Sequence, residues 1–319
     1  AYTLGAPPLT NGVPVLSITG ALAQQLLALI GSPTPPIIHI KVTVVRANVI
    51  SQNILAESKS GNADNVVMAG AHLDSVDVNS GMIDNGSSSA TILEIALKMA
   101  KVKPINKLRF AWWTGEEIGL LGSTFYVNHL STDAKSKIAV YLNYESLGAP
   151  NGGRLIMGTA TGLTSPGSEV VTQLYKDYFA KLGLGVLVFD PSFQSAVSRS
   201  DQFPFIVAGI PIGFIVTGAN FPWLAEYSAA MPDLAPSRTI GLNTHPCYHI
   251  VCDTLTLDGN LLSDPNFDFN LYEQMSRAAA FAILTYSMST ESINGVRGKG
   301  NFSPDINLKL LKSHHDDEE

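Results

Sequence analysis

The chain has 319 residues, of which 45% are hydrophobic, and its formal net charge at pH 7 is −7. This length corresponds to one large domain or to one domain with a small addition, and the composition allows a substantial buried core. The acidic balance, with no block of Lys and Arg, argues against a nucleic-acid partner.

The first 36 residues are rich in Pro, Gly and small apolar residues. They are too few to form a core of their own. Within them we expect a strand over residues 13–18 and a short helix over residues 21–30. Because the first residue is Ala1 rather than Met, we also expect a processed or trimmed chain.

From residue 37 onward, the pattern predicts strands that alternate with helices. Runs of β-branched residues predict strands over 38–49 and 66–70. A helix over 87–100 follows from apolar residues at helical spacing. The alternation continues with strands over 108–113, 138–143, 186–189 and 212–216, and with helices over 115–130, 168–182, 202–208 and 271–288. This order predicts an α/β fold with a mostly parallel sheet that helices cover on both faces.

Two further segments bear on membrane binding and on the carboxyl terminus. The longest apolar stretch, residues 205–219, is too short to cross a bilayer and is interrupted by Gly and Pro, so we expect no membrane partner. Residues 289–319 are polar and end in His314-His315-Asp316-Asp317-Glu318-Glu319. This composition favours a disordered tail over a metal site.

The two cysteines, Cys247 and Cys252, lie five residues apart in a segment that is typical of a loop. Two inert buried thiols are one interpretation, but a local disulfide suits this spacing better. A disulfide would place the protein in an oxidising compartment, so we expect a secreted, extracellular protein. Asn301-Phe302-Ser303 matches the N-glycosylation pattern, which fits the same compartment.

Ionisable side chains follow three predicted strands and recur in two loops: His72, Asp74, Asp84, Glu116, Glu117, Glu145 and His249. The carboxyl ends of parallel strands meet at the edge where open α/β sheets bind ligands. Taken singly, a His–x–Asp pair also occurs in ordinary cores, and paired Glu are favoured by a helix dipole alone. Together, several unpaired carboxylates at one edge would repel each other unless a cation lay between them. Carboxylate and imidazole ligands suit zinc, and two close ions suit hydrolysis.

Five motifs carry these residues in a fixed order: Ala71-His72-Leu73-Asp74-Ser75-Val76, Asp84-Asn85-Gly86-Ser87, Trp113-Thr114-Gly115-Glu116-Glu117 with Gly119-Leu120-Leu121-Gly122-Ser123, Arg199-Ser200-Asp201, and Cys247-Tyr248-His249. Between residues 50 and 288 the chain resembles the secreted di-zinc aminopeptidases of bacteria and fungi, the leucyl-aminopeptidase type. The resemblance implies a three-layer αβα zinc-exopeptidase fold over residues 37–288. Residues 12–18 resemble the last strand of a protease-associated domain, so residues 1–36 are expected to be its remnant.

The resemblance also implies roles for the matching residues. Two zinc ions would be bound, with Asp84 between them, by His72, Asp84, Glu117, Glu145 and His249. Glu116 would be the general base that takes a proton from a metal-bound water. Tyr248 would donate a hydrogen bond to the oxyanion, and Arg199 would contact the substrate.

Three local features complete the implied site. Asp74 would accept a hydrogen bond from the ring of His72 and thereby select its tautomer. The Asp84–Asn85 peptide bond would be cis. A Cys247–Cys252 bridge would hold the loop that presents Tyr248 and His249.

Glu145 departs from the family pattern, in which Asp is usual. Glu is common at this place in related zinc exopeptidases that release carboxyl-terminal residues, so a carboxypeptidase on the same scaffold is the alternative. An inactive binding domain and a one-zinc enzyme similar to glutaminyl cyclases are two further alternatives. Capable residues at every ligand position argue against both. We therefore expect a monomeric metallo-exopeptidase that acts on peptide substrates, at the amino end in preference to the carboxyl end.

Overall fold

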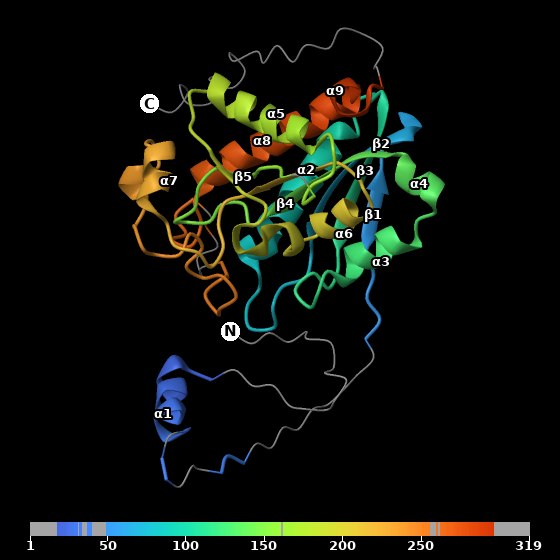
Figure 1. The fold of residues 1–319 in the computed structure, drawn as a ribbon. Coiled ribbons are helices and arrows are strands. Elements are labelled where there is room, and N and C mark those ends of the chain that lie inside the picture. Colours follow the sequence, from blue (N-terminus) through green and yellow to red (C-terminus); the bar gives the residue numbers. More distant parts are fainter. Residues whose placement is uncertain are drawn as a thin grey trace.

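The protein is described by a computed structural model over residues 18–30, 32–33, 37–39, 49–160, 162–255, 260 and 262–296. Within these residues the body is built on one seven-stranded sheet in the order β1-β3-β2-β4-β7-β5-β6 (Figure 1). The strands are β1 Ile54–Glu57, β2 Asn62–His72, β3 Asn106–Trp113, β4 Ile138–Glu145, β5 Leu155–Met157, β6 Leu187–Phe189 and β7 Ile212–Val216.

The centre of the sheet is parallel, as predicted. β2 pairs in parallel with both β3 and β4, and β4 pairs in parallel with β7. β1 is antiparallel to β3, and β5 is antiparallel to β7. All residues of β4 except Glu145 are buried, which is why this strand has a continuous apolar run rather than an alternating pattern.

Helices cover both faces of the sheet. The helices of the described residues are α1 Gly20–Ile30, which has no buried residue and lies apart from the sheet in Figure 1, α2 Ser88–Met99, α3 Leu121–His129, α4 Thr132–Ser136, α5 Ser168–Lys181, α6 Gln202–Val207, α7 Ala225–Ala230, α8 Phe269–Met288 and α9 Glu291–Asn294. Side chains of β4 show which helix lies on which face. The Tyr144 hydroxyl lies 3.2 Å from that of Tyr175 on α5, whereas the Tyr141 ring stacks on Phe205 of α6. α2 and α8 lie beside α5 on the first face, and α3 lies beside α6 on the second (Figure 1).

The helix predicted over residues 115–130 begins later, at Leu121. Gly115, Gly119 and Leu120 have positive φ angles of 67°, 114° and 57°, which are incompatible with a continuous right-handed helix. Glu116 and Glu117 therefore lie in a turn after β3, and the predicted placement at a helix start is wrong. The strand predicted over 138–143 also extends to Glu145.

The structure describes only part of each end of the chain. Helix α1 confirms the prediction for residues 21–30, whereas residues 1–17 and 40–48, which hold most of two predicted strands, lie outside the described residues. Residues 289–296 do not form a tail, because Thr290 and Asn294 hydrogen-bond Asn65 of β2 at 2.8 Å. Residues 297–319, with the Asn301 sequence, are outside the described part. No described helix combines the length and hydropathy needed to cross a membrane.

Candidate metal centre

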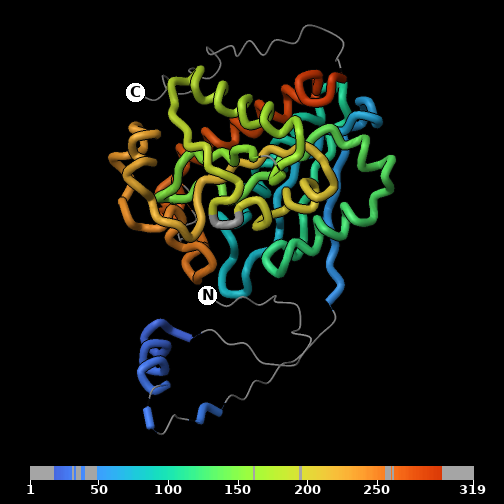
Figure 2. Tube along the Cα trace, viewed as in Figure 1, coloured from blue at the N-terminus to red at the C-terminus, as the bar shows by residue number. Residues whose placement is uncertain are grey.

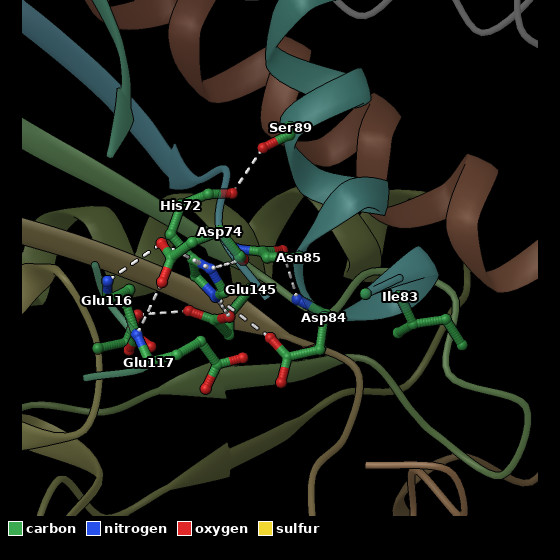
Figure 3. A network of polar contacts seen from close by, with 12 residues as sticks. His72, Asp74, Ile83, Asp84, Asn85, Ser89, Glu116, Glu117 and Glu145 are labelled. Atoms are coloured by element: carbon green, nitrogen blue, oxygen red, sulfur yellow. Dashed lines mark hydrogen bonds and ion pairs between the residues drawn. The ribbon is translucent and has the colours of Figure 1, made fainter. Parts of the chain in front are cut away.

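The carboxyl ends of β2, β3 and β4 bring the predicted ionisable residues together (Figure 3). His72 is the last residue of β2 and Glu145 is the last residue of β4. Glu116 and Glu117 follow β3, and all of these side chains point toward Asp84 or toward each other. The convergence that the sequence predicted is thus present in the fold.

Two groups of side chains meet at Asp84. In the first group, His72 Nε2 lies 2.8 Å from Glu145 Oε1 and 3.2 Å from Asp84 Oδ1. In the second group, His249 Nε2 lies 2.9 Å from Glu117 Oε2 and 3.2 Å from Asp84 Oδ2. Asp84 therefore presents one carboxylate oxygen to each group. Within each group the ligand atoms lie within 4.8 Å of one another, close enough for a single ion.

Asp74 supports the site in a different way from the one predicted. Its backbone carbonyl, at 2.8 Å, is the partner of His72 Nδ1, while its carboxylate is 3.8 Å from that nitrogen. The carboxylate instead accepts hydrogen bonds of 3.1 Å from the backbone N–H groups of Glu116 and Glu117 (Figure 3). Asp74 thus still selects the His72 tautomer with a free Nε2, but through its main chain. Its side chain holds the turn that carries the two glutamates.

The backbone around Asp84 is held by two residues to which sequence reasoning gave no role. The Asp84–Asn85 peptide bond is cis, as predicted. Asn85 donates to the carbonyl of Tyr144 and accepts from the amide of Ser146. Asp253 accepts hydrogen bonds from the amides of Ile83, at 2.8 Å, and of Asp84, at 3.1 Å. The only sequence signal for Asp253 was its place directly after Cys252.

Glu145 is held by Ser200, another residue without a predicted role. The Ser200 hydroxyl donates to Glu145 Oε2, and Asn143 Nδ2 donates to the same hydroxyl at 2.9 Å. Glu145 therefore keeps only Oε1 directed at His72 and Asp84. The sequence signal was present, because Ser200 lies in the Arg199-Ser200-Asp201 motif.

The charge of the cluster suits a cation. Burial raises the pKa of Glu145 to about 7 and raises the pKa of Glu116 well above its ordinary value. Burial would also raise the pKa of Asp84, but the imidazoles on either side hold that pKa well below its usual range. Buried carboxylates of this kind need protons or metal ions to neutralise them.

Two buried atoms indicate where ions would fit. Glu117 Oε1 has no hydrogen-bond partner among the described residues, and His249 Nε2 forms no hydrogen bond of normal geometry. Both atoms belong to the groups that share Asp84. Mixed oxygen and imidazole donors are the ligands that zinc takes in hydrolytic enzymes. The residues present therefore fit zinc.

A pocket opens beside the clusters. Its empty volume, with the open mouth included, is about 750 Å³. Asp84, Glu116, Glu145, Arg199 and Tyr248 line it, so the predicted base, oxyanion donor and substrate contact share one cavity. Apart from these residues, most of the wall is apolar: Leu155, Leu187, Phe189, Phe193, Phe214, Val216, Phe221 and Tyr227.

The Tyr248–His249 loop is closed by the predicted disulfide. Cys247 and Cys252 are bonded, with a Sγ–Sγ distance of 2.10 Å. The Tyr248 ring stacks on the His249 ring, with centroids 3.8 Å apart. The phenol and the imidazole are thus fixed relative to one another inside a short covalent loop.

The sequence is similar to known proteins. Residues 53–264 match peptidase family M28. An aminopeptidase of Pseudomonas aeruginosa (strain UCBPP-PA14) is 37% identical over 288 residues, which cover 88% of this chain and 50% of the relative. A probable leucine aminopeptidase 2 of Aspergillus fumigatus is 33% identical over 299 residues, covering 92% and 56%. The chain thus spans about half the length of these curated relatives.

Solved structures share the fold. The zinc aminopeptidase BSAP of Bacillus subtilis superimposes with a TM-score of 0.55 at 24% identity, covering 73% of this chain and 49% of that one. A glutaminyl cyclase of an Acidobacteriales bacterium gives 0.52 at 17% identity, covering 74% and 73%. Since a peptidase and a cyclase both have this fold, the fold alone does not distinguish the two activities.

Proposed function

The chain belongs to peptidase family M28, and from this premise we propose that it is a two-zinc metallo-exopeptidase that releases amino-terminal residues from peptides. The observation that carries the proposal is the shared Asp84, with one oxygen directed at each ligand group. His72 and Glu145 would hold one ion with Asp84, and Glu117 and His249 would hold the other. The Cys247–Cys252 disulfide further supports a secreted, extracellular location.

Different residues of this chain would have separate roles in peptide hydrolysis. Bound zinc supplies Lewis acidity, which polarises the scissile carbonyl and lowers the pKa of water. Glu116 lines the pocket and has a carboxylate oxygen within 4.8 Å of ligand atoms of His72 and Glu117. It is not a member of the two groups that share Asp84, and at this position it could take a proton from the attacking water and pass it to the leaving amine. Tyr248 lines the same pocket, and its hydroxyl can donate to the negative charge that develops on the carbonyl oxygen.

The polar groups that line the pocket favour the amino end. The carboxylates of Asp84, Glu116 and Glu145 line it, and Arg199 is the one cationic side chain that lines the described cavity. Carboxylate oxygens of Glu116 and Glu145 can accept hydrogen bonds from an ammonium group, whereas a carboxylate terminus has Arg199 as its one cationic side-chain partner there. The carboxypeptidase alternative rests on Glu145 and on Arg199 as a single carboxylate partner.

Three versions of one hexapeptide test the choice of end. The first has both termini free, the second has an acetylated amine and the third has an amidated carboxyl group. We expect mass spectrometry to show loss of the first residue from the free and amidated peptides, and no cleavage of the acetylated one. Loss of mass from the carboxyl end, with resistance of the amidated peptide, would establish the carboxypeptidase instead.

The apolar wall predicts a preference for the first side chain. A buried aromatic and aliphatic surface favours large apolar groups, since a charged group would lose its hydration there. We expect peptides that begin with Leu or Phe to have kcat/KM values about 10²-fold above those that begin with Asp. Matched peptides that differ only in the first residue provide the measurement, and equal values would contradict this use of the pocket.

A further inference from the structure

Asp253 holds the segment that presents the shared ligand. Its carboxylate is fully buried and accepts the amides of Ile83 and Asp84 through different oxygens, at 2.8 and 3.1 Å. Its backbone carbonyl accepts from the amide of Met82, at 3.3 Å, and from the hydroxyl of Ser80, at 3.4 Å. One residue thus binds the main chain on three consecutive positions that end at Asp84.

The same residue continues the disulfide loop. Asp253 directly follows Cys252, so the closed loop 247–252 and Asp253 form one short segment. Asn79 also donates to the carbonyl of Ile250 in this loop, at 3.0 Å. Figure 2 shows the resulting arrangement, with the orange chain near residue 250 beside the teal chain near residue 80. The segment therefore touches the Asp84 loop at several points.

A carboxylate is an unusual choice for a purely structural contact here. No Lys or Arg pairs with Asp253 among the described residues, and the nearest imidazole nitrogen, His245 Nε2, is 3.8 Å away, beyond hydrogen-bond distance. Burying a carboxylate without a cationic partner is costly. What the carboxylate provides is two acceptors in one plane, which fit two consecutive N–H donors. An amide side chain offers only one.

We propose that Asp253 is a positioning residue that sets Asp84 between the two ligand groups, so that segment 247–253 assembles both halves of the metal centre. It supplies His249 directly and orients Asp84 through the Ile83 and Asp84 amides. This inference rests on the two-metal function proposed above. Groups that orient a metal ligand typically affect metal affinity or activity by 10- to 100-fold.

The test compares Asp253→Asn with Asp268→Asn. Asp268 also accepts a backbone amide, from Leu271 at 2.9 Å, but it does so at the start of α8, outside the loops that carry the proposed ligands. In the Asp253→Asn variant, the NH₂ group replaces one of the two acceptor oxygens. Either the Ile83 or the Asp84 amide therefore loses its hydrogen-bond acceptor. We expect faster hydrogen exchange at residues 83 and 84 in the metal-free protein, Zn²⁺ affinity about 10- to 100-fold lower by chelator competition, and a lower kcat with little change in KM. The Asp268 variant should match the wild type in all three measurements.

Two results would overturn the proposal. One is an Asp253→Asn protein with wild-type Zn²⁺ affinity and wild-type exchange at residues 83 and 84. The other needs no variant and applies even if Asp253→Asn fails to fold: rapid exchange of the Ile83 and Asp84 amides in the metal-free wild type. Slow exchange there supports the role of Asp253 independently of peptidase activity. A wild-type protein that binds no Zn²⁺ would refute the proposed function while leaving the exchange result to decide on Asp253.

Discussion

Glu116 and Glu117 are neighbours in the chain with different surroundings. Glu117 Oε2 lies 2.9 Å from His249 Nε2, whereas Glu116 lines the pocket beside the candidate metal centre. The turn between β3 and α3 makes this separation possible, because Asp74 fixes both backbone amides and the positive φ of Gly115 delays the helix. At the scale of single residues, the site depends on main-chain contacts as much as on ligand identity.

Replacing Glu116 by Ala should leave the fold and metal content intact while kcat falls by about 10²–10⁴-fold, the usual contribution of a general base. The measurement pairs zinc analysis with turnover of a leucyl peptide. Glu117→Ala is the matched comparison, since it should lose metal as well as activity. Near-normal turnover by Glu116→Ala would mean that another group removes the proton.

Replacing Glu145 by Asp should keep or raise aminopeptidase activity. The shorter side chain keeps the negative charge and widens the space beside its ion by about one methylene, roughly 1.5 Å. Comparing kcat/KM for a free-amine peptide in the two proteins measures the effect. If the change instead creates aminopeptidase activity in a protein that had only carboxypeptidase activity, Glu145 defines a carboxypeptidase.

At the scale of elements, the strand ends and the disulfide loop position the proposed ligands. β2 and β4 each terminate in a proposed ligand, His72 and Glu145, so the sheet sets the distance between them. The remaining proposed ligands come from irregular segments that need other restraints. For His249 that restraint is the disulfide, since the residue has a positive φ of 58° inside the loop between Cys247 and Cys252.

Replacing both cysteines by Ser should therefore weaken metal binding as well as stability. On a chain-entropy estimate, closing a loop of this length is worth about 2 kcal/mol. We expect a lower denaturation midpoint in urea and weaker Zn²⁺ binding in chelator competition. Reductant provides the control, because it should shift the wild type toward the variant and leave the variant unchanged. Unchanged Zn²⁺ affinity in the variant would show that the loop is held by its other contacts.

At the scale of the whole molecule, the metal centre concentrates negative charge at the edge of a buried sheet. The chain as a whole carries a net charge of −7, and acidic side chains that meet at this edge include Asp84, Glu116, Glu117 and Glu145. Their mutual repulsion opposes folding, so cations that bind the native state should stabilise it. Zinc bound at the proposed site would therefore stabilise the domain as well as serve its chemistry.

Removing zinc should lower the melting temperature, and restoring it should raise it in a concentration-dependent manner. At a free Zn²⁺ concentration of 100 times Kd, each site contributes about 2.7 kcal/mol. Thermal melts at buffered Zn²⁺ concentrations test this, with Mg²⁺ as the control, because Mg²⁺ prefers all-oxygen octahedral sites with several waters. A melting temperature that does not depend on Zn²⁺ would contradict native-state binding.

The sequence by itself determined the layered α/β fold and most of the residues that meet at the candidate site. Long buried strands such as β4 have apolar runs that are readable locally, and residues at strand ends follow from them. The motifs located His72, Asp84, Glu117, Glu145 and His249, and implied the cis bond and the disulfide, both of which are present. Short elements such as β5 and α7 escaped prediction because a few residues carry too little periodic signal.

Only the tertiary structure decided how the ligands are held. The Asp74 carboxylate reaches the amides of Glu116 and Glu117 rather than His72, and Asp253 reaches the amide of Asp84, which is 169 residues away in the chain. Such hydrogen bonds depend on which backbone groups the folded chain leaves unpaired at one point in space. No local pattern encodes them, because each partner is chosen by the packing of segments far apart in the sequence.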